Sequence, residues 1–336
     1  MTAWQVVYRS ENAANATISV SGTVLVPTAA WTGPGARPLI SWGVGTRGLG
    51  DQCAPSYTLS TGSDYEGTVI NDALKKGWAV AVSDMEGLGT PGMHTYEVGR
   101  SQGKAMLNMA RAAERLPGTG LSTSTPLGLW GYSQGGTTAG WAAELAPTYA
   151  PELNLKGVAA GGVPADLNAV AQFLDGGPAV AFALLAAVGY DTAYPELKLS
   201  SYLNAEGKKW LASSQSLCLA SVDGVGALGG TAFHHLSDYT TTNPLPTPAW
   251  QARLSQNKLG SGKPTVPVFQ YHAQLDEIVA YDQADALHRA WCAKGVKLTW
   301  KPLLIAEHAT GMLEGEGDAL TFLADRFAGK PATTNC

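Results

Sequence analysis

The chain has 336 residues, 45% of them hydrophobic and 15% charged, a composition typical of an ordered globular protein with a large core. Its formal net charge is −5 and it contains no run of lysine and arginine, so nucleic acid is not an expected partner. The longest apolar stretch, residues 178–188, is much shorter than the roughly 20 residues of a membrane-spanning helix. We therefore expect a globular protein without an integral membrane segment.

Strand patterns and helical patterns alternate along most of the chain. Residues 17–26 alternate between polar and apolar side chains, and the apolar runs 38–42 and 78–83 are typical of buried parallel strands. Apolar residues recur at helical spacing over residues 96–115, before a Leu-Pro-Gly stop signal. Further strands are expected at 155–160, 266–271 and 296–300, and helices at 282–294 and 316–327. This alternation predicts an α/β fold with a mostly parallel, doubly wound sheet.

Residues 165–255 interrupt this alternation. They are rich in alanine, glycine, leucine and serine, and they contain no clear pattern of a central strand. We interpret them as an insertion of helices between two strands of the sheet. The expected organisation is a core made of residues 1–164 and 256–336, with the insertion at 165–255 as a cap.

The most informative motif is Gly131-Tyr132-Ser133-Gln134-Gly135. The apolar run before it, residues 125–130, is typical of a buried strand, and residues 136–146 after it have a helical pattern. Strand, sharp turn and helix are the context in which G-x-S-x-G forms the nucleophile elbow of the α/β-hydrolase fold. The flanking glycines leave room for the strained turn. We therefore expect Ser133 to be a nucleophile rather than part of a glycine-rich loop, and the insertion to lie over the active site.

A serine nucleophile needs a base within hydrogen-bond reach and a carboxylate that orients the base. In α/β-hydrolases both follow the serine in the chain, and the acid precedes the histidine. His308 follows a strand and opens the loop before the final helical pattern, where the base is expected. Asp276 follows the preceding strand and is expected to orient His308, with Glu277 as the neighbouring alternative. His272 is only four residues from Asp276, which is too near in sequence for the usual partner.

The oxyanion of the tetrahedral intermediate needs two hydrogen-bond donors. One is expected from the backbone N–H of Gln134, and the second from the oxyanion loop, the glycine-rich residues 43–48. This loop also matches G-x-G-x-x-G, the dinucleotide fingerprint, which requires a helix to start within it. Residues 49–56 do not have a helical pattern, so a nucleotide is disfavoured and no cofactor is expected.

The four cysteines, Cys53, Cys218, Cys292 and Cys336, are widely spaced and form no C-x-x-C pair, so a zinc site is not expected. Their even number suits two disulfides in an oxidising compartment, with free cytosolic thiols as the alternative. The first residues contain neither a basic segment nor an apolar one. We expect a secreted protein whose signal peptide is absent from this sequence.

Together with the elbow, several segments of the chain resemble the secretory lipase family. They follow one another between residues 40 and 336, at 51–57, 83–87, 149–154, 173–178, 276–279, 292–295 and 305–308. The resemblance implies a catalytic triad, two disulfides and an oxyanion loop with two donor candidates. The residues so implied are Ser133, Asp276 and His308 for the triad, Cys53–Cys218 and Cys292–Cys336 for the disulfides, and Thr46 and Arg47 for the loop.

Two features depart from the family pattern. Bacterial members often have a His-Gly-Thr-Thr-Gly-like oxyanion loop, whereas this chain has Val44-Gly45-Thr46-Arg47-Gly48, so either Thr46 or Arg47 supplies the second donor. The fungal member extends beyond its last cysteine as a flap over an acyl tunnel, whereas this sequence ends at Cys336. From this we expect an open site, short to medium acyl chains, and acyl transfer to alcohols in water.

The expected function is hydrolysis of carboxylic esters through an acyl-enzyme. The expected partners are a small ester or lipid substrate and an alcohol as a second acyl acceptor. A dedicated acyltransferase uses the same residues and differs only in how its cap admits water or alcohol. A serine peptidase on this fold usually needs an acidic site for the substrate amine, and no convincing one is visible in the sequence. A catalytically inactive binding protein is disfavoured by the intact set of three residues.

Overall fold

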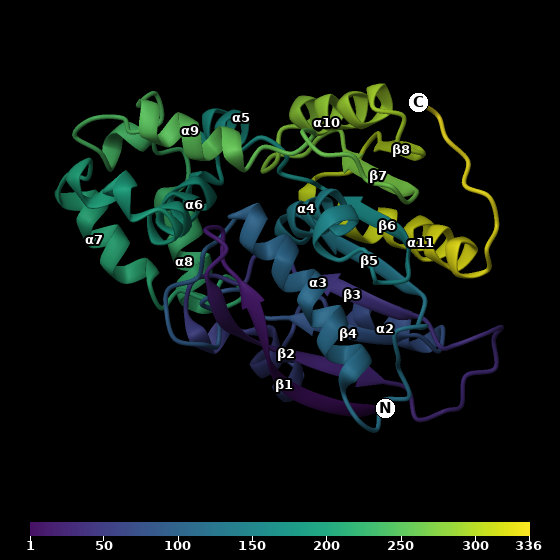
Figure 1. The fold of residues 1–336 in the computed structure, drawn as a ribbon. Helices are drawn as coiled ribbons and strands as arrows, with labels where there is room; N and C mark the ends of the chain where they lie inside the picture. Colours follow the sequence, from purple (N-terminus) through teal and green to yellow (C-terminus); the bar gives the residue numbers. More distant parts are fainter.

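The computed structural model of the protein describes residues 1–336 and contains one sheet of eight strands (Figure 1). The strands are β1 (Thr2–Glu11), β2 (Thr17–Val26), β3 (Leu39–Gly43), β4 (Ala79–Ser83), β5 (Leu127–Tyr132), β6 (Leu155–Gly161), β7 (Val268–Ala273) and β8 (Leu298–Leu303). Their order in space is β1-β2-β4-β3-β5-β6-β7-β8. The pairs β1–β2 and β2–β4 are antiparallel, and all other neighbouring strands run parallel.

Helices cover both faces of the sheet and bury their apolar sides against it. Those around the sheet are α1 (Pro55–Thr61), α2 (Gly67–Lys75), α3 (Gly99–Arg115), α4 (Gln134–Tyr149), α10 (Tyr281–Ala293) and α11 (His308–Phe327). The helices α3, α4 and α10 share one buried cluster with the sheet, through residues such as Met106, Ala139 and Leu287. The helices α2 and α11 share another, through Ile70 and Leu320. This confirms the mostly parallel, doubly wound sheet.

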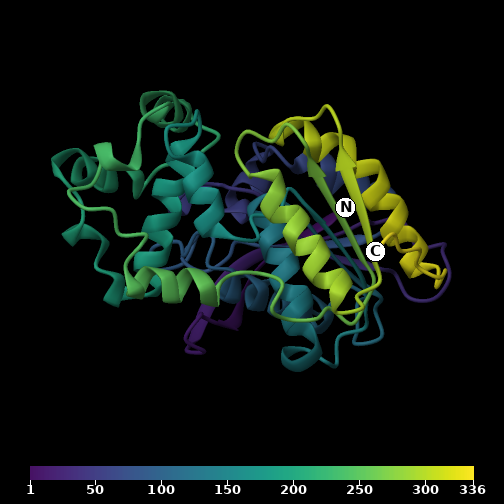
Figure 2. The same cartoon turned by 90° about the horizontal axis from the view of Figure 1, so that it is seen from above.

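The segment between β6 and β7 consists of helices and contributes no strand to the sheet. Its helices are α5 (Leu167–Leu174), α6 (Val180–Ala193), α7 (Ala205–Ser214), α8 (Val222–Thr231) and α9 (Pro248–Gln256). Seen from above, they gather at one end of the molecule (Figure 2). Their buried cluster around Tyr190 and Trp250 also includes Leu49, Tyr96 and Val279 from loops that follow strands of the sheet. The insertion therefore packs against these loops. No helix of the protein is both long and apolar enough to span a membrane.

Several element boundaries differ from the expected ones. The strand at residues 17–26 pairs along its length with β1, a strand that the sequence pattern did not indicate. The strands β7 and β8 each begin two residues later than expected. The final helix begins at His308 rather than at residue 316. Its early glycines are places of close packing rather than helix breakers. A Cβ on Gly311 would lie 2.6 Å from the Tyr132 hydroxyl oxygen, and one on Gly315 would lie 2.3 Å from the Tyr271 ring.

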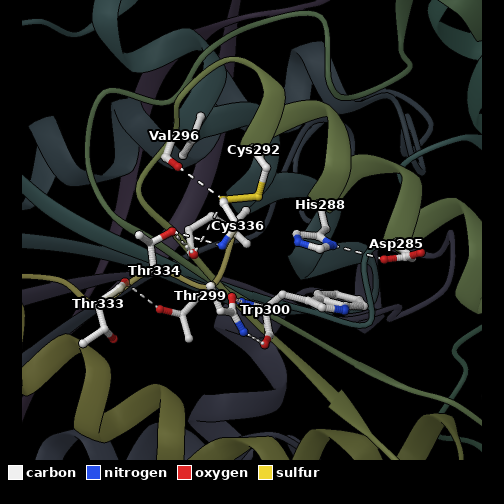
Figure 3. Close-up of a disulfide and its surroundings, with 11 residues drawn as sticks. Asp285, His288, Cys292, Val296, Thr299, Trp300, Thr333, Thr334 and Cys336 are labelled. Carbon is white, nitrogen blue, oxygen red and sulfur yellow. Dashed lines mark hydrogen bonds and ion pairs between the residues drawn. A yellow bond between two sulfur atoms is a disulfide. The ribbon is translucent and has the colours of Figure 1, made fainter.

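Two disulfides connect distant segments. Cys53–Cys218 joins the region after β3 to the segment between α7 and α8, and Cys292–Cys336 joins α10 to the last residue (Figure 3). These are the pairs that the family resemblance implies, and no cysteine is free. The C-terminal residues run beside β8, where the Asn335 side chain bonds to both the N–H and the carbonyl of Trp300. The second disulfide therefore holds a tail that covers the last strand of the sheet.

Candidate active site

Ser133 lies at the sharp turn between β5 and α4. Its backbone angles are φ 58° and ψ −125°, a strained conformation that often marks functional sites. Its N–H donates to the carbonyl of Gly161 at 3.0 Å. A Cβ on Gly131 would lie 2.2 Å from the carbonyl oxygen of Gly135, and a Cβ on Gly135 would lie 2.0 Å from that of Gly43. The turn therefore closes only with glycine at both flanking positions.

The structure brings Ser133, His308 and Asp276 together in one hydrogen-bonded chain. The Oγ of Ser133 lies 2.9 Å from Nε2 of His308, and Nδ1 of His308 lies 2.7 Å from Oδ2 of Asp276. Because the carboxylate can only accept, Nδ1 carries a hydrogen, and Nε2 is left to accept from the serine hydroxyl. Asp276 follows β7, and His308 is the first residue of α11 rather than part of a loop before it.

The alternative residues take other positions. Glu277 accepts a hydrogen bond from the backbone N–H of His308 at 3.1 Å, so it holds the start of α11 and does not face the Nδ1 atom. His288 pairs with Asp285 on α10 and stacks on Trp300 with the rings 7° from parallel, outside the hydrogen-bonded chain.

The groups around Asp276 keep it ionised. Its side chain is buried, and Oδ1 accepts from the backbone N–H groups of Ile278 at 3.0 Å and Val279 at 2.6 Å. Burial opposes the charge, but the hydrogen bond from His308, the nearby imidazoles of His308 and His272 and the Val279 N–H outweigh it. The pKa of Asp276 is therefore below its usual range. Such a carboxylate can stabilise the imidazolium that forms when a serine proton is transferred.

Two residues that support this arrangement were not indicated by the motif spacing. Tyr132 donates its hydroxyl to the carbonyl of His308 at 2.7 Å. Nδ1 of His94 donates to the Glu86 carbonyl at 2.7 Å, which leaves Nε2 to accept from the side-chain amide of Gln134 at 3.0 Å. Burial lowers the pKa of His94 to about 4, so this ring is neutral at pH 7. Tyr132 and Gln134 are the two x positions of G-x-S-x-G, whereas no sequence pattern indicates His94.

Both expected sources of oxyanion donors lie near Ser133. Gln134 is the first residue of α4, so its N–H has no carbonyl partner within the helix. Thr46 lines the same cavity as Ser133 and His308, and its backbone N–H makes no hydrogen bond within the protein. The Thr46 hydroxyl is engaged with the Tyr96 hydroxyl at 2.7 Å. The backbone N–H, rather than the side chain, is therefore the group that Thr46 has available.

Arg47 is not among the residues that line the cavity and belongs to a buried ionic cluster. Its guanidinium contacts Asp64 at 2.8 Å and Glu66 at 3.0 Å, and it lies over the Tyr65 ring at 4.0 Å. The side chains of Arg47, Asp64 and Glu66 are 4%, 2% and 1% exposed. Glu66 also accepts from the backbone N–H of Gly45 at 2.9 Å. The cluster therefore fixes the backbone conformation of the oxyanion loop.

The cavity beside Ser133 has a volume of about 290 Å³ and a mostly apolar lining. The insertion supplies much of this lining, including Leu167 from α5, Ala183 from α6 and Trp250 from α9. Met312 from α11 lines it on the side of the core. The arrangement joins a serine, an imidazole and free backbone N–H groups to an apolar cavity, which is the chemistry that acyl transfer requires. No cluster of three or more metal-ligating side chains is present.

Comparison with a family model, with relatives in sequence and with solved structures leads in each case to proteins named as lipases. Residues 52–335 match the family model described as secretory lipase. The chain is 33% identical to a probable inactive lipase of Mycobacterium tuberculosis, over 99% of this chain and 75% of the relative. It is 31% identical to a secreted triacylglycerol lipase of Malassezia furfur, over 99% of this chain and 70% of the relative. The crystal structure of Candida antarctica lipase A in its closed state superposes with a TM-score of 0.84 at 30% identity, covering 98% of this chain and 79% of that one.

These matches span nearly the whole chain and include both the strand that leads to Ser133 and the helix that begins at His308. The chain therefore belongs to the secretory lipase family, has the α/β-hydrolase fold and is a lipase-type serine hydrolase.

Proposed function

We propose that the protein hydrolyses carboxylic esters through Ser133, with His308 as general base and Asp276 as the group that orients it. Nε2 of His308 takes the hydroxyl proton as Oγ attacks the ester carbonyl, and then gives this proton to the departing alcohol. The acyl group remains on Ser133 as an ester until water, deprotonated by the same imidazole, releases the acid. The observation that carries the proposal is the chain of hydrogen bonds of 2.9 and 2.7 Å.

We assign the oxyanion site to the backbone N–H groups of Gln134 and Thr46. Both are without an internal partner, and Gln134 directly follows the nucleophile whereas Thr46 lines the same cavity as the nucleophile. Donors that are fixed before reaction stabilise the developing charge without reorganisation, and loss of one typically costs about 10²–10³ in turnover. In this assignment Arg47 braces the loop and does not touch the substrate.

The helices of residues 165–255 act as a cap over a core made of residues 1–164 and 256–336. The cap lines the cavity with apolar side chains, which favours an acyl chain as the bound group. Each buried methylene contributes about 0.8 kcal/mol, so affinity rises with acyl length until the cavity is full. A volume of about 290 Å³ is at the small end of ligand pockets, which span about 300–1,000 Å³. The best substrates are therefore esters of short to medium acyl chains.

An alcohol is the second acyl acceptor in this proposal. The apolar lining next to Ser133 and His308 accommodates the carbon chain of an alcohol, whereas it offers water few hydrogen-bond partners. The acyl-enzyme is then divided between hydrolysis and transesterification. We place the protein outside the cytoplasm, because it has two disulfides and relatives that are named secreted lipases.

The test is a series of p-nitrophenyl esters from acetate to palmitate, measured with and without added alcohol. One relative is named a probable inactive lipase, so the first measurement is whether this protein hydrolyses any ester of the series. Ser133→Ala is expected to lower turnover by on the order of 10⁴-fold or more without loss of fold. The matched control is Ser124→Ala, at an exposed serine before β5, which should leave turnover unchanged. A folded Ser133→Ala variant with near-normal activity would contradict the mechanism, and a peak at palmitate would contradict the substrate class.

A further inference from the structure

His272 is a buried histidine that the proposed mechanism does not use. It lies in β7, and its side chain is fully buried. Its Nε2 lies 2.8 Å from the carbonyl oxygen of Val279 and 3.3 Å from Oδ2 of Asp276. The same Oδ2 accepts the hydrogen bond from His308. Two imidazoles therefore approach one carboxylate.

The neighbours of His272 determine which of its nitrogens carries the hydrogen. A carbonyl and a carboxylate can only accept, so the hydrogen is on Nε2. Nδ1 is buried without a partner, and a proton placed there would be an unsolvated charge.

The surroundings also keep this ring neutral. Burial lowers the pKa of His272 against the opposing effects of Asp276 and the Val279 carbonyl, and His308 lowers it further. The titratable groups that face it are Asp276, His308 and Tyr281, whose ring meets the imidazole edge-on at 5.9 Å. His272 therefore acts on its surroundings as an uncharged donor.

We propose that His272 is a positioning residue that keeps Asp276 oriented and ionised while His308 carries the transferred proton. The inference rests on the proposed triad. The Nε2–H of His272 holds the Val279 carbonyl, and the Val279 N–H in turn holds Oδ1 of Asp276 at 2.6 Å. The positive end of the His272 Nε2–H also lies beside Oδ2 of Asp276 and stabilises the negative charge of the carboxylate.

The chemical consequence is that His272 and His308 share the negative charge of Asp276. Without the N–H of His272, Asp276 has more negative charge to share with His308 and is less firmly oriented. His308 then faces a carboxylate of different charge and is misaligned as a base. Loss of the N–H should therefore change both the rate and its dependence on pH.

The experiment compares two substitutions of His272. His272→Phe keeps a ring against Tyr281 but removes the N–H, whereas His272→Gln keeps an amide donor in its place. For His272→Phe we expect kcat/KM for a p-nitrophenyl ester to fall about tenfold or more, and the acidic limb of the pH profile to move to higher pH. His272→Gln should recover most of both effects.

His288 provides the matched control. It pairs with Asp285 at 3.1 Å on α10 (Figure 3) and takes no part in the hydrogen bonds of the triad. His288→Phe therefore removes a similar histidine–aspartate contact and should leave the acidic limb unchanged. Wild-type kcat/KM and an unmoved limb in folded His272→Phe overturn the proposal. Equal losses in His272→Phe and His272→Gln also overturn it, because they indicate packing alone.

If neither variant folds, NMR of the histidine ring nitrogens in the unaltered protein decides the question. A His272 that stays neutral with hydrogen on Nε2 across the activity profile supports the proposal, and one that titrates with activity overturns it. Failure of the triad itself is recognised separately, as activity retained by Ser133→Ala.

Discussion

Replacing Arg47 with methionine separates a bracing role in the oxyanion loop from a direct role in catalysis. Methionine retains the length of the side chain and removes its charge and its donors. Asp64 and Glu66, which contact the guanidinium at 2.8 and 3.0 Å, are then left in a region where their side chains are 2% and 1% exposed. The buried acids lose the cation that balances them, and the Gly45 N–H keeps only a destabilised partner in Glu66.

The magnitude follows from this burial. Removing one partner of a buried ion pair costs about 3–5 kcal/mol, because the remaining charge is neither solvated nor paired. With an unfolding entropy of about 2.1 cal/mol/K per residue, a chain of 336 residues loses about 1.4 °C of Tm for each kcal/mol, so we expect Tm to fall by about 4–7 °C. Arg47→Met combined with Glu66→Gln should recover part of the loss, because the second change removes one of the two unpaired charges.

The assay is urea unfolding followed by fluorescence of the ten tryptophans, together with kcat for a short-chain p-nitrophenyl ester. A bracing Arg47 predicts that stability and kcat fall together and recover together in the double variant. The opposite pattern refutes this reasoning. If kcat falls on the order of 10²–10³-fold while stability changes by less than about 1 kcal/mol, Arg47 is itself an oxyanion donor.

Two further predictions concern a buried acid and the C-terminal tail. Burial raises the pKa of Glu97 to about 8, so its ionisation destabilises the folded state progressively from the unfolded pKa near 4.5 up to pH 8, and not below that range. Glu97→Gln should therefore raise the free energy of unfolding at pH 9 and leave it unchanged at pH 4, as measured in urea, and an equal effect at both pH values would contradict the assignment. Replacing Cys292 and Cys336 with serine opens a loop with a sequence separation of 44 and should cost about 4 kcal/mol. It should also release the tail from β8 and increase aggregation in light scattering, whereas unchanged stability would show that the hydrogen bonds of residues 333–335 hold the tail without the disulfide.

The sequence by itself determined those features that depend on short stretches of chain. The elbow at Ser133 requires a strand, a tight turn with two glycines and a helix, and all of these are contiguous, so the motif predicts its own geometry. The alternation of strand and helix patterns predicted the doubly wound sheet for the same reason. Parallel strands place their carboxyl ends on one edge, so residues that follow two of them, Asp276 and His308, could be chosen as partners before any distance was known.

Only the tertiary structure decided the features that depend on contacts between distant segments. His94 reaches Gln134 across 40 residues of sequence, and the Tyr132 hydroxyl reaches the His308 carbonyl across 176, and no local pattern encodes either contact. The sequence of residues 43–48 did not distinguish Thr46 from Arg47 as the hydrogen-bond donor. Their surroundings differ because Asp64 and Glu66, which come from another segment, bind the guanidinium and leave the Thr46 N–H free. This difference between the surroundings of Thr46 and Arg47 is a property of packing, which the periodicity and spacing of the sequence do not contain.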